Sequence, residues 1–382
     1  MTIRTLILSG GGGRGAFHAG VYKYLSETHK EKVDATHSAA WEPDIIVGTS
    51  IGAVNGAAIA QGTSAAELER IWLALREHDI EGLPPGMRSL TRFVVNRVMR
   101  SIIGTKLEVV PKAQARSPSA DESWPALPVL PKSLSERLIG RWNNLLDTGP
   151  LEQTLIHKMR IDPDKLAASK TTLIITATNV QTGEQVTFSN RPIHCRKTGN
   201  ARADVRVGIT INRIIASCSV PLVYPWTKDG DDYYWDGAVV ANTPLGASLD
   251  VASELSRDRV PTEPMEVLVV MMTPWWEEGE DIPRGRAKMP GDFGEAITWT
   301  LDWALLASFR SRLHTTRMCN KLGLEQAHEG RPITYRQVEV KVIAPKDFMP
   351  VARIIDYDEV SSELIRQGYN AARDVFQRDF GG

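Results

Sequence analysis

Hydrophobic residues in the first part of the chain alternate between short continuous runs and longer stretches with helical spacing. A β-rich run over residues 2–9 is ended by glycines, which is typical of a strand. Residues 16–28 carry apolar side chains at helical spacing, and the short apolar run Ile45-Ile46-Val47 precedes a helix of small residues over 53–61. Strands and helices that alternate through tight turns predict a mainly parallel central sheet covered by helices.

Later segments continue this alternation. Three further segments have the character of strands, over residues 172–178, 267–272 and 338–343. Thr182 and Gly183 predict the turn of a hairpin whose second strand covers residues 185–188. Ser64 followed by Glu67 predicts a capping box at the start of a helix, and residues 293–322 predict a long, partly buried helix that closes the core.

The region from about 83 to 146 interrupts the pattern. It holds a basic stretch with helical spacing over 89–106 and then a proline-rich segment that disfavours regular structure. We interpret it as an insertion over the core, either a cap or a surface excursion without a role. Its basic helix either packs on the core or lies on an anionic membrane surface. We therefore expect one domain over 1–382, with a motif-bearing core about 2–250, the cap-like insertion 83–146, and residues 251–382 completing the fold.

Composition narrows the class of protein. The 382 residues carry 45 Lys and Arg against 46 Asp and Glu, so no overall charge favours nucleic acid as a partner. Neither a signal peptide nor an apolar run of the ~18 residues that a spanning helix needs is visible, so we expect a cytoplasmic protein. Cys195, Cys218 and Cys319 lie far apart, which predicts unpaired thiols rather than a disulfide framework or a zinc site.

A candidate nucleophile follows the second predicted strand. Residues Gly48-Thr49-Ser50-Ile51-Gly52 fit the pattern G-x-S-x-G, with a strand before it and a small-residue helix after it. The glycines allow strand and helix to approach closely, and the serine oxygen then stands at the end of the sheet. Beside the helix N-terminus, backbone amides favour developing negative charge. The sequence therefore predicts Ser50 as a nucleophile, with a serine-capped glycine turn as the bland alternative.

A glycine loop, Gly10 to Gly15, follows the first predicted strand and leads into a helix. Its amides suit either a dinucleotide phosphate or the oxyanion of an ester. The dinucleotide pattern needs an acidic residue at the end of the next strand, where this chain has Ser50, and a Walker loop needs a lysine after Gly15. The oxyanion interpretation is favoured, since both loops lie at the carboxyl edge of a parallel sheet. Arg14 either holds this loop, meets a lipid phosphate, or is an exposed arginine with no special partner.

Serine attack needs a proton acceptor. His314 and His328 come late in the chain, as in α/β-hydrolases, but neither follows a strand, and His314 lies in a predicted helix. Asp236 is the better candidate, because it ends a short aromatic strand and is followed by Gly237, so its carboxylate can face a neighbouring loop. On this segment alone, a simple turn aspartate is the alternative.

Taken in order, these segments resemble the motifs of the patatin-like phospholipase family. The glycine loop with its basic residue resembles that family's oxyanion motif, Ser50 lies in its nucleophile motif, and Asp236-Gly237-Ala238 resembles its D-G-A/G motif. Residues 216–221 with Tyr224-Pro225, and Asn242-Thr243-Pro244, resemble the segments that precede and follow the aspartate. The resemblance covers about residues 2–247 apart from the proline-rich insertion.

The resemblance implies a Ser-Asp dyad without histidine, a three-layer α/β fold and hydrolysis of acyl esters of lipids. Ser50 would attack the ester carbonyl, Asp236 would accept its proton, and the amides of Gly11, Gly12 and Gly13 would bind the oxyanion. Supporting roles fall to Gly10, Arg14, Gly15, Gly48, Gly52 and Gly237. The expected partner is a phospholipid or another lipid ester, with peripheral contact to a membrane surface. No metal and no organic cofactor is implied.

Two other functions remain open. A serine acyltransferase would use the same acyl-enzyme on Ser50 and pass the acyl group to an alcohol or thiol. A non-enzymatic nucleotide- or lipid-binding module would use only the glycine loop. Product analysis with and without an acceptor alcohol separates the first from a hydrolase, and labelling of Ser50 by a fluorophosphonate argues against the second.

Overall fold

The computed structural model describes residues 2–31, 41–80, 146–194, 200–202, 204–255, 264–277, 289–290, 293–347 and 360–378. The predicted insertion over 83–146, with its basic stretch 89–106, lies outside these ranges apart from Leu146, and so does Cys195. Of the helices in these ranges, none combines the length and the apolar character that crossing a membrane requires.

In the described part of the chain, nine strands form one sheet whose centre is parallel. Across the centre the order is β3 (Thr172–Asn179), β2 (Ile45–Thr49), β1 (Ile3–Leu8), β8 (Met265–Val270) and β9 (Val338–Ile343). Beyond β3 the sheet continues with β4 (Gln185–Ser189), which is antiparallel to β3, and β5 (Val205–Val207). The mainly parallel sheet predicted from the sequence is confirmed.

A second antiparallel addition decides where the site lies. The hairpin of β6 (Thr227–Asp229) and β7 (Asp232–Asp236) joins the sheet through β7, which pairs with the last residues of β3. The predicted hairpin turn at Gly183 is also present, because β3 and β4 pair in antiparallel register and Gly183 has a φ of +71°.

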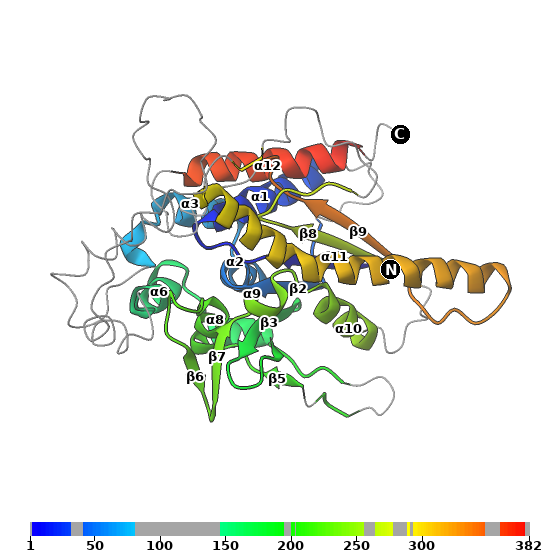
Figure 1. The fold of residues 1–382 in the computed structure, drawn as a ribbon, viewed down its shortest axis with the longest axis horizontal. Coiled ribbons are helices and arrows are strands. Elements are labelled where there is room, and N and C mark those ends of the chain that lie inside the picture. Colours follow the sequence, from blue (N-terminus) through cyan, green and yellow to red (C-terminus); the bar gives the residue numbers. More distant parts are fainter. Residues whose placement is uncertain are drawn as a thin grey trace, which may run out of the picture.

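Helices cover both faces of the sheet, as Figure 1 shows. One face is packed by α1 (Ala16–Glu31), α2 (Ile51–Ala60), α3 (Ala65–Ala74), α6 (Gly149–Gln153), α7 (Pro163–Ala168), α8 (Ile211–Cys218) and α12 (Ser361–Arg378). The other face is packed by α10 (Leu245–Leu255) and α11 (Phe293–His328). Short elements complete this fold: η1 (Gly12–Gly15), η2 (Glu77–Asp79), η3 (Thr154–Lys158) and α9 (Ala238–Ala241).

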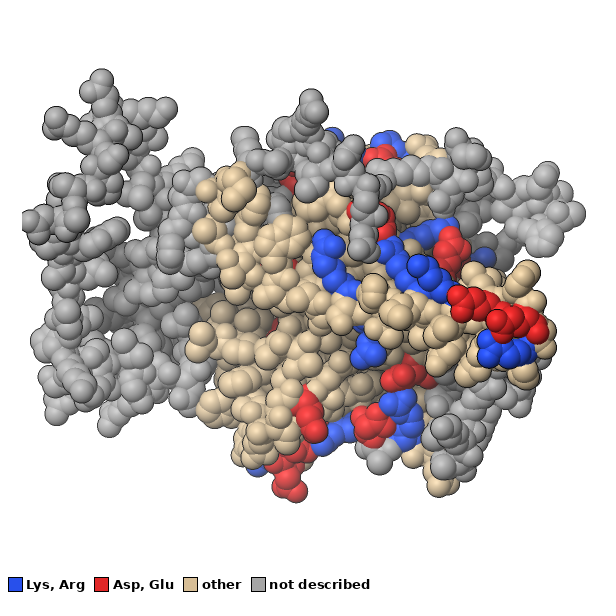
Figure 2. Space-filling view, turned by 45° about the vertical axis from the view of Figure 1, so that its right-hand side comes forward, with Lys and Arg blue, Asp and Glu red and all other residues tan. Residues whose placement is uncertain are grey.

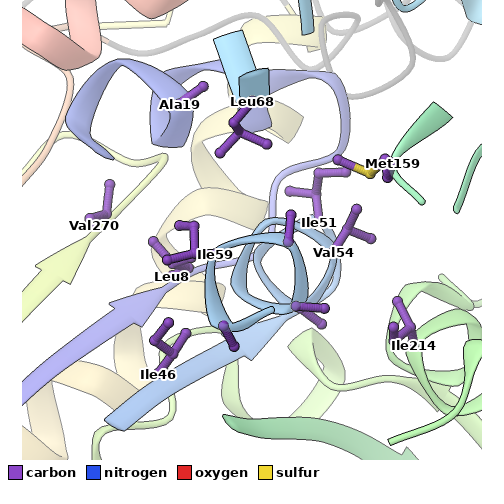
Figure 3. Packing of buried hydrophobic residues seen from close by; sticks show 14 of the residues in the cluster. Leu8, Ala19, Ile46, Ile51, Val54, Ile59, Leu68, Met159, Ile214 and Val270 are labelled. Carbon is purple, nitrogen blue, oxygen red and sulfur yellow. The ribbon is translucent and has the colours of Figure 1, made fainter. Parts of the chain in front are cut away.

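The pleat of the strands explains the two cores. In β1, Leu6 and Leu8 pack under α1 and α2, whereas Ile7 packs toward α10 and α11. Because both faces are buried, successive strand residues are apolar, which is why these strands read as continuous apolar runs. Figure 3 shows α2 in the middle of the first core, with Ile51 and Val54 among the packed side chains.

Some boundaries and one cap differ from the sequence predictions. The small-residue helix begins at Ile51 rather than at 53, and β8 covers 265–270 rather than 267–272. Ser64 caps α3 by accepting a hydrogen bond from the Glu67 amide at 3.2 Å, but the Glu67 carboxylate binds the Arg70 guanidinium instead of closing the predicted box. The long helix predicted over 293–322 is present as α11 and continues to His328.

Candidate active site

Ser50 occupies a sharp turn between β2 and α2. Its φ of 56° and ψ of −128° lie in a region that residues with a side chain rarely adopt, at a cost of about 1–3 kcal/mol. Glycine is required on both sides, because a Cβ at Gly48 would collide with the Gly52 backbone and a Cβ at Gly52 with the Leu8 carbonyl. The close approach that the G-x-S-x-G pattern predicts is therefore present.

The backbone of this turn is clamped by Ser217 of α8. The Ser50 amide donates a hydrogen bond of 2.9 Å to Ser217 Oγ, and that hydroxyl donates at 2.7 Å to the Thr176 carbonyl of β3. Sequence reasoning did not single out Ser217, although it lies in the segment 216–221 that precedes the aspartate motif. Its side chain links the turn to the sheet.

Strand register brings Asp236 to the same place. β2 pairs with β3 as far as Thr49, which lies opposite Thr176. The next residue of β3, Ala177, pairs with Asp236 of β7. Ser50 follows Thr49 directly, so the last residue of β7 and the turn after β2 meet at neighbouring positions along β3. Two residues that are far apart in sequence therefore share one edge of the sheet.

The backbone around Asp236 leaves room only for glycine at the next position. A Cβ on Gly237 would lie 2.5 Å from the Thr176 carbonyl oxygen. The Asp236 amide donates to the Ser219 carbonyl at 2.8 Å, and its own carbonyl accepts a hydrogen bond of 2.9 Å from the Thr178 hydroxyl. The strand end is thus fixed from three sides, which orients the carboxyl group.

The carboxyl group of Asp236 is buried, with 1% of the residue exposed. Burial raises its pKa to about 7, while hydrogen bonding from the Ser50 hydroxyl and from the Ala238 amide, which donates to Oδ1 at 2.7 Å, acts in the opposite direction. Among the described residues, Oδ2 has no hydrogen-bond partner of regular length and angle. The contact between the Asp236 carboxyl and the Ser50 hydroxyl is therefore longer or more bent than an ordinary hydrogen bond.

The glycine loop lies beside this pair. The Gly10 amide donates to Asn242 Oδ1 at 2.9 Å, and the Arg14 amide donates to the Gly11 carbonyl at 3.2 Å. The backbone amides of residues 11–13 lie between these two, before the first amide that donates within η1. Within the described structure these three amides have no hydrogen-bond acceptor. They are free to bind an anionic oxygen, and Asn242, which sequence reasoning noted only within N-x-P, holds the start of the loop.

The far end of the loop is held by a buried polar network on α2. Asn55 Nδ2 donates to the Gly15 carbonyl at 3.0 Å and lies 3.2 Å from His18 Nδ1, and Asn55 Oδ1 accepts from the Trp72 indole at 2.9 Å. Burial lowers the pKa of His18 to about 3, so its imidazole is neutral. His18 therefore belongs to the scaffold of the loop.

Arg14 is buried beneath the loop rather than exposed, with 1% of the residue accessible. Its guanidinium donates to the Gly11 and Met272 carbonyls at 3.3 and 3.4 Å and pairs with Asp302 Oδ1 of α11 at 3.4 Å. Of the two roles considered for Arg14, this geometry favours holding the loop over meeting a lipid phosphate. Asp302 gave no signal in the sequence.

Replacing Asp302 by alanine is expected to lower the free energy of unfolding by about 3–5 kcal/mol, because it leaves the Arg14 charge buried without its partner. Urea unfolding measures the effect. The matched control is Glu363→Ala, which breaks an exposed ion pair with Arg366 and should change stability little. Equal losses of unfolding free energy in the two variants would show that the buried pair stabilises the fold no more than the exposed pair does.

A cavity of about 360 Å³ opens at Ser50 and Asp236. Its described lining includes the glycine loop, the segment 218–224, α9 and one side of α11. Charged residues in this lining are Arg14, Asp236 and Asp302, and all three are buried. No histidine belongs to the described lining, and His314 and His328 lie exposed on α11. Over the described ranges no cluster of three or more His, Cys, Asp or Glu suits a metal ion.

Comparison with known proteins gives one family. The family model described as "Patatin-like phospholipase" matches residues 6–249. A search of curated proteins finds no match. Among solved structures, VipD from Legionella pneumophila is 12% identical with a TM-score of 0.42, over 99% of this chain and 67% of that chain. The ExoU-SpcU complex of the type III secretion system of Pseudomonas aeruginosa is 12% identical with a TM-score of 0.31, over 99% of this chain and 51% of that chain.

Proposed function

The chain belongs to the patatin-like phospholipase family, and we propose that it is a lipid acyl hydrolase in which Ser50 and Asp236 form the catalytic dyad. The observation that carries the proposal is their arrangement along β3. A serine on a strained turn and a buried carboxyl meet at one sheet edge, beside free backbone amides and at the opening of a largely apolar cavity. The proposal assigns the roles of nucleophile, proton acceptor, oxyanion donor and acyl site to these groups.

Two half-reactions follow from this arrangement. Ser50 Oγ attacks the ester carbonyl and passes its proton to the Asp236 carboxylate, while the amides of Gly11, Gly12 and Gly13 stabilise the oxyanion. The tetrahedral intermediate collapses to an acyl-enzyme, and the leaving alcohol takes the proton from Asp236. Water then attacks the acyl-enzyme and gives a proton to Asp236, and as the second tetrahedral intermediate collapses, Asp236 passes this proton to Ser50 Oγ, which releases the fatty acid and free Ser50. Each cycle consumes one ester and one water.

The lining of the cavity supports a lipid substrate. Several of its polar groups lie at the dyad and the glycine loop, and Tyr224 and Ser308 add two more, whereas most of the remaining lining residues are apolar, including Val220, Val223 and Leu305. An ester carbonyl fits the polar end and a hydrocarbon chain fits the apolar walls. A lipid ester resides at an interface, so the protein contacts a lipid surface during turnover.

The rate of ester hydrolysis is expected to rise with pH through about 7. Asp236 must be ionised to accept the serine proton, and burial raises its pKa to about 7. The plot of kcat/KM against pH for a water-soluble ester should therefore rise between pH 6 and 8 and then level, with an inflection near 7. A profile that is flat from pH 5 to 9, in a protein shown to stay folded, would contradict a titrating Asp236 base, whose pKa lies near 7.

The proposed function is tested by product analysis. Purified protein is incubated with mixed phospholipid vesicles and with p-nitrophenyl butyrate, with and without an acceptor alcohol. Free fatty acid from vesicles, with no acyl transfer to the alcohol, is the expected result. Dominant transfer would identify an acyltransferase instead. Cleavage of neither substrate would leave the lipid hydrolase without support.

A further inference from the structure

One wall of the cavity comes from a helix beyond the segment that the family model matches. Leu301, Ala304, Leu305 and Ser308 of α11 line the cavity, and their spacing places them on one side of the helix. The family match ends at residue 249. The shape of this wall is therefore set by residues that the family motif does not include.

The cavity side of α11 stands against the short helix α9. Leu301 is 49% exposed, and across the opening Val239 and Val240 are 52% and 37% exposed. These side chains leave an apolar surface in water at the mouth of the cavity, which costs free energy until something apolar covers it. In Figure 2, the left part of the described surface is mostly uncharged, and charged side chains lie from its middle toward the right-hand and lower borders.

Two sets of contacts hold α11, so the wall has a fixed position. Leu306, Phe309 and Leu313 are buried in the second core, and Asp302, which itself belongs to the cavity lining, binds Arg14 beneath the glycine loop. A change at Ala304 or Leu305 therefore alters the groove along this wall without removing these contacts. Ala304 has a small side chain at the middle of this side, where a larger one would narrow the groove.

We propose that the cavity side of α11 is the wall along which the acyl chain of the substrate lies, and that Ala304 and Leu305 set the chain length that the site accepts. The proposal rests on the proposed function, since the chain must start at a carbonyl held by Ser50. The groove begins at the dyad and its charged lining residues are buried, so its occupant is a hydrocarbon chain rather than a charged head group.

The test compares Ala304→Leu with Ala307→Leu. Ala307 is an exposed alanine on the same helix that does not belong to the described lining, so the control makes the same change of side chain away from the cavity. The ratio of kcat/KM for p-nitrophenyl palmitate to that for the butyrate ester is measured in detergent micelles. Ala304→Leu should lower this ratio about 10-fold or more, because the added carbons displace part of a long chain, and Ala307→Leu should not change it. Leu305→Ala should raise the ratio.

The results separate this proposal from the proposed function. If wild type cleaves esters and Ala304→Leu lowers both rates by one factor, or if Ala307→Leu shifts the ratio as much, the wall is not where the chain lies. If wild type cleaves no ester, the proposed function fails. Binding of the fluorescent fatty acid cis-parinaric acid then tests independently whether an acyl chain lies along the α11 wall. Weaker binding in Ala304→Leu than in Ala307→Leu supports the groove, and equal binding overturns it.

Discussion

Replacing Ser50 by alanine is expected to lower kcat for ester hydrolysis by a factor on the order of 10⁴ or more, since the variant has no nucleophile to form an acyl-enzyme. Alanine is the appropriate replacement, because it keeps a Cβ in the strained backbone of the turn, where φ is 56°. Glycine would relieve that strain and change the stability as well. Initial rates with p-nitrophenyl butyrate measure the loss.

The matched control for this prediction is Ser26→Ala. Ser26 lies on α1, its hydroxyl donates to the Lys23 carbonyl, and it does not belong to the described lining of the cavity. This control should keep the wild-type rate. Circular dichroism must show that both variants are folded. A Ser50→Ala variant that retains a large share of the activity would mean that another group forms the covalent intermediate.

Replacing Asp236 by asparagine is expected to abolish activity and, at alkaline pH, to stabilise the fold. Asparagine has nearly the same shape, and its side-chain oxygen can still accept the hydrogen bond from the Ala238 amide, but it cannot take the Ser50 proton. In wild type the pKa of Asp236 is about 7 in the folded state against an ordinary value of 3.8. Between these two values the folded protein holds a proton that the unfolded chain has released.

The sign of the stability effect follows directly. Because the folded state binds more protons in this window, the free energy of unfolding of wild type falls as pH rises from about 4 to about 7, and the loss persists above 7. The contribution of this group is on the order of 4 kcal/mol, since one pKa unit corresponds to about 1.4 kcal/mol. Asparagine has no proton to lose, so the variant should lack this slope and exceed wild type in stability at pH 8.

Urea unfolding of wild type and Asp236→Asn at acid and alkaline pH checks this prediction, together with initial rates. An inactive variant that is more stable than wild type only at alkaline pH would agree with a buried carboxyl that lowers stability but is needed for catalysis. A variant with full activity would show that Asp236 is not the proton acceptor. Parallel stability curves would show that Asp236 does not titrate between the two states.

The strand-and-helix frame of this protein could be predicted from the sequence because its signals are local. Short β-rich or apolar runs marked β1, β2 and β3, the alternating segment 338–343 marked β9, and glycines marked the turns that follow the first two. The sharp turn at Ser50 could be predicted for the same reason. The close contact between strand and helix depends on Gly48 and Gly52, which lie two residues on either side. The parallel sheet covered by helices followed from this pattern, and the three-layer arrangement from the resemblance to the family.

The rest depends on contacts across the chain. β7 pairs with β3 directly beyond the point where β2 ends. This register depends on strand pairing between distant segments, and the residues around Asp236 do not reveal it. The burial of Arg14 could not be predicted either, because its partner Asp302 lies 288 residues later in a helix that reads only as amphipathic. A charged side chain beside a glycine run looks exposed until its partner is known.

The most direct test of a Ser50 nucleophile is the site of a covalent adduct. The protein is treated with an alkyl fluorophosphonate, the intact mass is measured, and the modified residue is identified by peptide mapping. One adduct on Ser50, formed faster by wild type than by Asp236→Asn, is the predicted result. Attachment to a neighbouring serine such as Ser217 or Ser219, or no adduct on folded protein, would contradict the account.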